Sequence, residues 1–187
     1  ISYQKASGLA MFSGIVIFCF YSFIRLKEML PVEEYGYDAI FFILLILCFA
    51  WGGDTCAYFA GRAFGKHKLC PVVSPKKTVE GAVGGVLGTM VFGVLITVIY
   101  SIAADRMEEF TRSNIGVSMY VIIALLACVA AVLGIYGDLF ASVVKRQCGI
   151  KDYGTIFPGH GGILDRFDSV MFIAPFVTMV VIAAFYD

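Results

Sequence analysis

The chain has 187 residues, of which 60% are hydrophobic and 15% are charged, and its mean hydropathy is +0.88. The hydrophobic fraction and the mean hydropathy are higher, and the charged fraction is lower, than in an ordinary soluble domain, which indicates that lipid surrounds much of the chain. Acidic and basic residues balance at 14 each, so no overall field favours nucleic acid as a partner. Attraction for an anionic ligand must therefore come from local clusters of charge.

Five apolar stretches are long enough to cross the hydrocarbon core as helices, which takes about 20 residues each. Lipid offers the backbone no hydrogen-bond partners, so these stretches should be helices and not open strands. Asp54 is the one charged residue inside them, and Gly81, Gly84, Gly85 and Gly88 have the GxxxG spacing that favours close helix packing. We predict an all-α, polytopic transmembrane helix bundle that forms a single domain, with spans near residues 6–24, 39–61, 81–104, 116–137 and 169–186.

The loops between these stretches alternate in positive charge. Residues 62–80 carry five Lys and Arg and residues 138–168 carry four, whereas residues 25–38 and 105–114 carry two each beside several acids. Positively charged loops tend to stay in the cytoplasm. We therefore expect the two basic segments to share the cytoplasmic face, where they can converge on one anionic ligand.

The six cysteines form no CxxC pair, and the two histidines are too few to complete zinc sites with them. We expect these cysteines to be apolar packing residues. The sequence starts at Ile1 without the residue order of a signal peptide, a pattern expected of a piece of a longer chain.

The second basic segment carries a candidate metal and phosphate site. If the fourth helix continues past its apolar run, Asp138, Ser142, Lys145 and Arg146 form one polar stripe. Asp165 and Asp168 open the final span, so three carboxylates can meet near one interface. Acids at membrane depth are costly, and a divalent cation would relieve both their burial and their mutual repulsion. Magnesium suits such a cluster, because it binds a few carboxylates and completes its shell with water and substrate phosphates.

The loop between these acids has the composition of a phosphate cradle. Gly161 and Gly162 allow the backbone N–H groups to approach an anion, and His160 can donate to the same phosphate. Simpler explanations remain open: Asp168 or Lys151 taken singly is equally consistent with a helix cap or a solvated loop charge, and His160 alone with a loop hydrogen bond. For Asp138 and Asp165 the functional interpretation is favoured, since acids at the membrane edge usually serve function.

The first basic segment is a second candidate binding region. Asp54, Tyr58 and Arg62 share a helix face, which predicts a substrate site or, alternatively, a snorkelling internal ion pair. The run from Gly61 to Lys68 fails the Walker pattern in spacing and lacks Ser or Thr after its lysine. Two lysines and two hydroxyls precede the third span: Ser74, Lys76, Lys77 and Thr78. The lysines could neutralise a triphosphate, or could bind anionic lipid headgroups and set topology.

Three motifs together resemble the phosphatidate cytidylyltransferase family. The longest is Ser142-x-Val144-Lys145-Arg146, four residues, Lys151-Asp152-x-Gly154, two residues, Phe157-Pro158-x-His160-Gly161-Gly162-Ile163-x-Asp165-Arg166-Phe167-Asp168. The others are Asp54-Thr55-x-Ala57-Tyr58-x-x-Gly61-Arg62 and Ser74-Pro75-Lys76-Lys77-Thr78-x-Glu80-Gly81. The resemblance extends from about Trp51 to the C-terminus.

The resemblance implies a membrane enzyme, commonly dimeric, that uses CTP and magnesium to convert phosphatidate into CDP-diacylglycerol and pyrophosphate. It implies further N-terminal spans, and a bacterial inner membrane or an organellar membrane as the location. By position, Asp138 and Asp165 would be metal carboxylates, with Asp168 a further candidate and a second cation an open question. Lys145, Arg146, Lys151 and Arg166 would then offset charge on the reacting phosphates.

Other classes of function remain open from the sequence. Asp54, Asp138 and glycine-interrupted helices could also form an ion or proton pathway in a transporter. That interpretation does not explain why basic residues cluster beside the acids. A cytidylyltransferase acting on another anionic lipid, and a noncatalytic lipid-binding subunit, are further alternatives.

Overall fold

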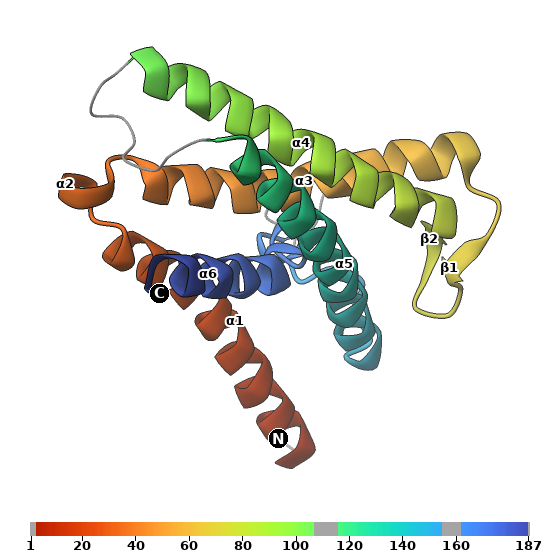
Figure 1. Ribbon diagram of the computed structural model, residues 1–187. Helices are drawn as coiled ribbons and strands as arrows, with labels where there is room; N and C mark the ends of the chain where they lie inside the picture. Colours follow the sequence, from red (N-terminus) through yellow and green to blue (C-terminus); the bar gives the residue numbers. More distant parts are fainter. Residues whose placement is uncertain (1–2, 107–115, 155–161, 187) are drawn as a thin grey trace.

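The computed structural model describes residues 3–106, 116–154 and 162–186. Its long helices are α1 (Tyr3–Met29), α3 (Asp38–Phe64), α4 (Val79–Arg106), α5 (Val117–Gln147) and α6 (Val170–Tyr186). Between them lie a short helix α2 (Val32–Tyr35), strands β1 (Lys68–Cys70) and β2 (Ser74–Thr78), and a 3₁₀ turn η1 (Leu164–Arg166). Figure 1 shows that the five long helices make up most of the molecule.

The predicted membrane bundle is confirmed. Four helices are long and apolar enough to cross a membrane: Ala10–Met29 of α1, and α3, α4 and α5 over their full lengths. The fifth, α6, is a shorter apolar helix of 17 residues with Pro175 inside it. At about 1.5 Å per residue, its length lies at the lower limit for a spanning helix.

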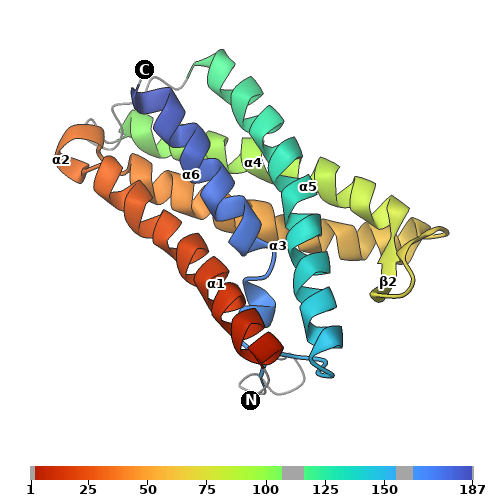
Figure 2. The same cartoon turned by 90° about the horizontal axis from the view of Figure 1, so that it is seen from below.

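Helix α3 is the centre of the bundle. It packs against α1, α4, α5 and α6, while α1 and α6 lie side by side, as Figures 1 and 2 show. Its buried face carries Phe41, Leu45, Ile46 and Phe49, each at most 1% exposed. This face belongs to one apolar core, to which α1, α4, α5 and α6 also contribute buried residues.

Small residues set the distance between α3 and α4. A Cβ atom added at Gly84 would lie 2.2 Å from the Cβ of Ala60, and one at Gly88 would lie 2.3 Å from the Cβ of Cys56. The predicted GxxxG packing is therefore confirmed. Because lipid tails are as apolar as side chains, close backbone contact supplies the attraction that hydrophobic burial cannot supply here.

Hydroxyl groups buried in this interface are internally satisfied. Thr89 and Thr97 are fully buried, and each donates to the carbonyl four residues earlier, Gly85 or Gly93, at 2.8 Å. Both side chains are shielded from solvent, so an unpaired hydroxyl would be costly. These bonds allow polar residues to lie at the crossing of α3 and α4.

The loop between α3 and α4 contains an antiparallel β-hairpin that the sequence analysis did not predict. Lys68 pairs with Thr78, and Cys70 pairs with Ser74. The Val79 N–H donates to the His67 carbonyl at 2.9 Å, and the Thr78 hydroxyl accepts the Gly81 N–H at 3.1 Å, capping α4. Figure 1 shows the hairpin at one end of the α3 and α4 pair, where it passes directly into α4.

Replacing Gly84 by Val should destabilise the bundle. The added side chain would overlap Ala60, and overpacking of a tight interface costs about 1–3 kcal/mol. The thermal unfolding midpoint of the protein in detergent micelles is the measurement. Gly14→Val on α1 is the matched control, because a Cβ at Gly14 meets nothing within 4 Å. Equal midpoints for the two variants would contradict the packing described.

Candidate active site

A cavity of about 620 Å³ lies where α3, α4, α5, the hairpin and the segment before α6 meet. Its volume is within the range typical of ligand sites. Five acids and five bases line it, so its formal charges balance. The acids are Asp54, Asp138, Asp152, Asp165 and Asp168, and the bases are Arg62, Lys76, Lys77, Lys145 and Arg166.

Most of the predicted site residues converge on this cavity. Nine of the ten charged residues named above were predicted as site residues, and the predicted Tyr58 and Thr78 also line the cavity. The tenth charged residue, Asp152, was not proposed as a site residue by the sequence analysis. Among the described residues, Ser74, Ser142, Arg146, Lys151 and Gly162 lie outside its lining. His160 and Gly161 lie outside the described residues.

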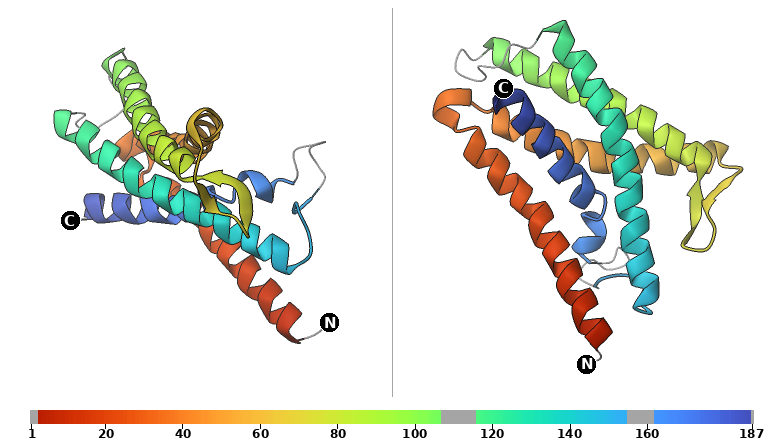
Figure 3. Two further views of the ribbon diagram at one scale, coloured as in Figure 1. Left: turned by 90° about the vertical axis from the view of Figure 1, so that its right-hand side faces the viewer. Right: turned by 60° about the horizontal axis from the view of Figure 1, so that its bottom comes forward.

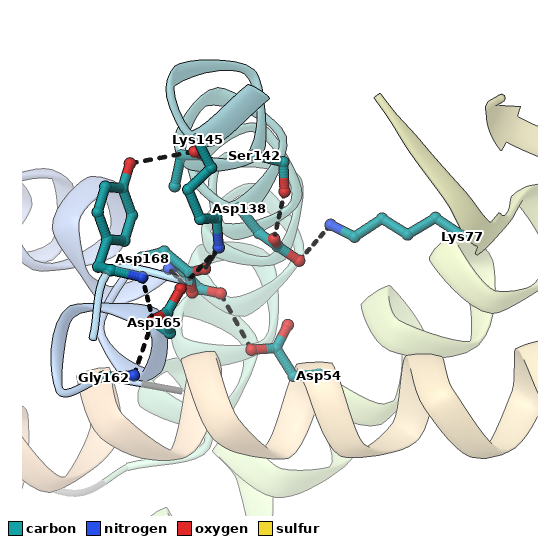
Figure 4. A network of polar contacts seen from close by, with 11 residues as sticks. Asp54, Lys77, Asp138, Ser142, Lys145, Gly162, Asp165 and Asp168 are labelled. Atoms are coloured by element: carbon teal, nitrogen blue, oxygen red, sulfur yellow. Dashed lines mark hydrogen bonds and ion pairs between the residues drawn. The ribbon is translucent and has the colours of Figure 1, made fainter. Parts of the chain in front are cut away.

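The continuation of the fourth helix is confirmed, because α5 runs unbroken from Val117 to Gln147. Of the polar stripe on this helix, Asp138 and Lys145 line the cavity. The Ser142 hydroxyl donates to Asp138 Oδ1 at 3.4 Å, and Lys77 of β2 forms an ion pair with Asp138 Oδ2. Figure 4 shows Lys77 reaching Asp138 from the hairpin side. The two basic segments of the sequence therefore meet at one carboxylate.

Asp165 holds the loop segments together. Its Oδ1 accepts from Lys145 Nζ at 2.8 Å, and its Oδ2 accepts the N–H groups of Tyr153 and Gly162 at 2.8 and 2.9 Å. Burial alone would raise the pKa of this carboxyl, but these three donors hold it below its ordinary value. Asp165 is therefore anionic at neutral pH, with both oxygens engaged within the protein.

Asp168 is the most buried of the cavity acids outside the long helices. It is 7% exposed; its Oδ1 accepts the Ser169 N–H at 2.9 Å, and its Oδ2 lies 4.0 Å from Lys145 Nζ. Burial, and next the charge of Asp138, raise its pKa to about 7, against the opposing charge of Lys145. Negative charge around Asp168 is thus incompletely compensated by the protein.

Two contacts fasten the segment before α6 to the middle of α3. The Ser169 hydroxyl donates to Asp54 Oδ2 at 3.0 Å, and the Trp51 indole N–H donates to the Arg166 carbonyl at 3.0 Å. The Trp51 ring also meets the Phe167 ring edge-on at 5.9 Å. These contacts give Asp54, the one charge predicted inside a span, a polar partner from a distant part of the chain.

Glu80 positions the hairpin, a role that the sequence analysis did not identify. Its carboxylate accepts the N–H of Lys66 at 3.1 Å and the N–H of His67 at 3.2 Å, and it lies 2.6 Å from His67 Nδ1. The end of α3 is thereby clasped to the first turn of α4. The sequence did contain a signal, since Glu80 is a fixed position of the motif that includes Lys76 and Lys77.

The carboxylates of the cavity are suited to bind a magnesium ion that enters together with a phosphate ligand. They do not form a complete metal site by themselves. Within residues 3–106, 116–154 and 162–186, no three His, Cys, Asp or Glu side chains are arranged to enclose a metal ion. Four carboxylates nevertheless approach the cavity from α3, α5 and the segment before α6, as Figure 4 shows. Oxygen donors of this kind, few in number, suit a cation that takes its other ligands from phosphates and water.

Replacing Asp165 by Asn should loosen the loop between α5 and α6. Asn loses the charge that attracts Lys145 and weakens the acceptor for two N–H groups. Trypsin cleavage after Lys151, followed by mass spectrometry, should become at least about threefold faster, as expected when roughly 1 kcal/mol of local stability is lost. Asp105→Asn is the control, because Asp105 lies at the C-terminal end of α4, whereas the cavity borders the N-terminal end of that helix. Equal cleavage rates in the two variants would show that Asp165 does not organise the loop.

The chain is similar in sequence to proteins of a known family. The model of the cytidylyltransferase family matches residues 2–184. The chain is 36% identical over 159 residues to a phosphatidate cytidylyltransferase of Bacillus subtilis, covering 85% of this chain and 52% of that protein. It is 41% identical over 145 residues to one of Staphylococcus saprophyticus, covering 78% of this chain and 50% of that protein. The chain thus spans about half the length of the curated relatives it matches, and it belongs to the cytidylyltransferase family.

Proposed function

We propose that the protein transfers CMP from CTP to phosphatidate, forming CDP-diacylglycerol and pyrophosphate for phospholipid synthesis. One observation carries the proposal: acids and bases from both basic segments line a single cavity between apolar helices. The relatives named phosphatidate cytidylyltransferase support this substrate pair. A transporter would use the acids but would leave the five lining bases without a role.

The reaction requires two anions to be brought into line. An oxygen of the phosphatidate phosphate attacks the α-phosphorus of CTP, the new P–O bond forms, and the bond to the β-phosphate oxygen breaks as pyrophosphate leaves. The attacking phosphate is already anionic near neutral pH and needs no base to deprotonate it. Catalysis is therefore positioning and charge compensation.

The lining bases are placed for this work. Lys76 and Lys77 come from β2 and Arg62 from the last turn of α3, whereas Lys145 comes from α5 and Arg166 from η1. Bases from separate elements can each hold a phosphate while the phosphates approach one another. Arg146 and Lys151, exposed on the same segment, would add attraction for anions at the approach to the cavity.

Asp138, Asp165 and Asp168 would hold magnesium. Both oxygens of Asp138 and of Asp165 already have protein partners, whereas Asp168 Oδ2 has only Lys145 Nζ at 4.0 Å, so Asp168 is the best placed of the three. The ion would lower the negative charge on the CTP phosphates and stabilise the leaving pyrophosphate. A second cation is compatible with five cavity carboxylates. The orientation that we propose puts the cavity on the cytoplasmic face of a bacterial inner membrane, with all five long helices as spans and a homodimer as the assembly.

Asp138→Asn should abolish turnover, because the change removes the carboxylate at which Lys77 and Ser142 converge. CTP-dependent pyrophosphate release should be measured in liposomes with and without phosphatidate, together with ion flux. Asp105→Asn is the matched control and should retain activity. Near-normal CDP-diacylglycerol formation by Asp138→Asn would overturn the residue assignment, and ion flux without pyrophosphate release would overturn the enzymatic function.

Removal of divalent cations with EDTA should stop pyrophosphate release, and Mg²⁺ should restore it. Because the acids form no cage in the described residues, Mg²⁺ alone should leave the thermal unfolding midpoint unchanged. Mg²⁺ with CTP should raise the midpoint, since ligand binding to the folded state stabilises it. Full activity in EDTA, or equal stabilisation by Mg²⁺ without nucleotide, would contradict the arrangement described.

A further inference from the structure

Tyr153 lies between α5 and η1, at a position that the family motif leaves unspecified. Its backbone N–H donates to Asp165 Oδ2 at 2.8 Å, and its hydroxyl donates to the Ala141 carbonyl of α5 at 3.1 Å. The two ends of this residue are thus tied to different parts of the chain. Its ring is held in a fixed place beside the cavity.

The ring of Tyr153 lies next to Lys145. The Lys145 Nζ is 5.2 Å from the ring centroid, and the same atom donates to Asp165 Oδ1 at 2.8 Å. The side chain of Lys145 is only 12% exposed. An ammonium group this close to an aromatic face gains about 0.5–2 kcal/mol, more where water is excluded. Lys145 is therefore held between a carboxylate and an aromatic ring.

Helix α1 also contacts Tyr153. The ring of Phe12 stacks on that of Tyr153 with centroids 5.5 Å apart and planes inclined by 22°. Figures 2 and 3 show the N-terminal half of α1 beside the segment that follows α5. The position of Tyr153, and through it that of Lys145, depends on a helix that contributes no residue to the cavity lining given above.

The hydroxyl of Tyr153 remains a donor under working conditions. Burial, and next the negative charge of Asp165, raise the pKa of this phenol to about 12. Its bond to the Ala141 carbonyl therefore persists across the neutral range. The hydroxyl ties the loop to α5, whereas the ring is the part of the residue that meets Lys145.

We propose that Tyr153 is a positioning residue: its ring, braced by Phe12, fixes the place of the Lys145 ammonium group in the cavity. The effect on turnover rests on the proposed function, in which Lys145 compensates charge on the reacting phosphates. The effect on the accessibility of Lys145 does not depend on the proposed function. Replacement of the ring should therefore alter the accessibility of Lys145 as well as the rate of the reaction.

The test compares Tyr153→Leu, which removes the ring, with Tyr153→Phe, which removes only the hydroxyl. The intact protein in detergent micelles is treated with an amine-reactive reagent, and labelling of Lys145 is followed by mass spectrometry with the exposed Lys151 as internal reference. Labelling of Lys145 should become at least about threefold faster in Tyr153→Leu and stay near the native rate in Tyr153→Phe. Phe12→Leu should give an intermediate increase.

Turnover provides the second measurement. Tyr153→Leu should lower kcat about tenfold with less than about twofold change in the KM for CTP, because a misplaced Lys145 weakens stabilisation of the transition state more than binding. Tyr153→Phe should retain kcat within about twofold. Tyr136→Leu, which alters an exposed residue of α5 outside the cavity lining, is the matched control and should behave as the native protein.

Two results would overturn the proposal. One is unchanged Lys145 labelling in a folded Tyr153→Leu variant; the other is equal loss in the Leu and Phe variants, which would assign the role to the hydroxyl. If Tyr153→Leu does not fold, Phe12→Leu decides, and native labelling in that variant counts against the proposal. Absence of CDP-diacylglycerol formation by the native protein would overturn the proposed function, while the labelling would still test the placement of Lys145.

Discussion

Compensation of charge between apolar helices is the constraint on which this structure depends. Asp54, Asp138 and Asp168 lie among helices that lipid surrounds, where an uncompensated carboxylate is expensive. Each has a polar partner from another part of the chain: Asp54 accepts a hydrogen bond from the Ser169 hydroxyl, Asp138 pairs with the Lys77 ammonium, and Asp168 lies 4.0 Å from the Lys145 ammonium, which compensates it only in part. The hairpin, the extension of α5 and the segment before α6 are all arranged so that these partners reach the acids.

The close crossing of α3 and α4 makes this compensation possible. Glycines of α4 allow its backbone to approach Ala57 and Ala60, so that both helices border the same cavity. A bulkier interface would move the hairpin, which continues directly from α4, away from Asp138. The small-residue packing that stabilises helices in lipid thus also sets the width of the polar site.

Much of this arrangement follows from the sequence. The apolar runs predict the helices, and the spacing of Asp138, Ser142 and Lys145 predicts a polar stripe on α5, of which Asp138 and Lys145 line the cavity. The hairpin could not be predicted in this way, because its strands are short and contain Pro75 and adjacent lysines in place of an alternating apolar pattern. The role of Asp165 as a loop organiser was equally hidden, since two of the three donors to it are backbone N–H groups that leave no trace in residue identity.

The direct passage of β2 into α4 has a mechanical consequence. Thr78 ends the strand and Val79 begins the helix, while Glu80 clasps the preceding turn. The backbone of Lys77, the base that meets Asp138, therefore has no hinge of its own, and it can change position only if α4 moves with it. Lys77 is carried by the end of a long helix and not by a mobile lid, so little backbone freedom remains to be lost when an anionic ligand binds.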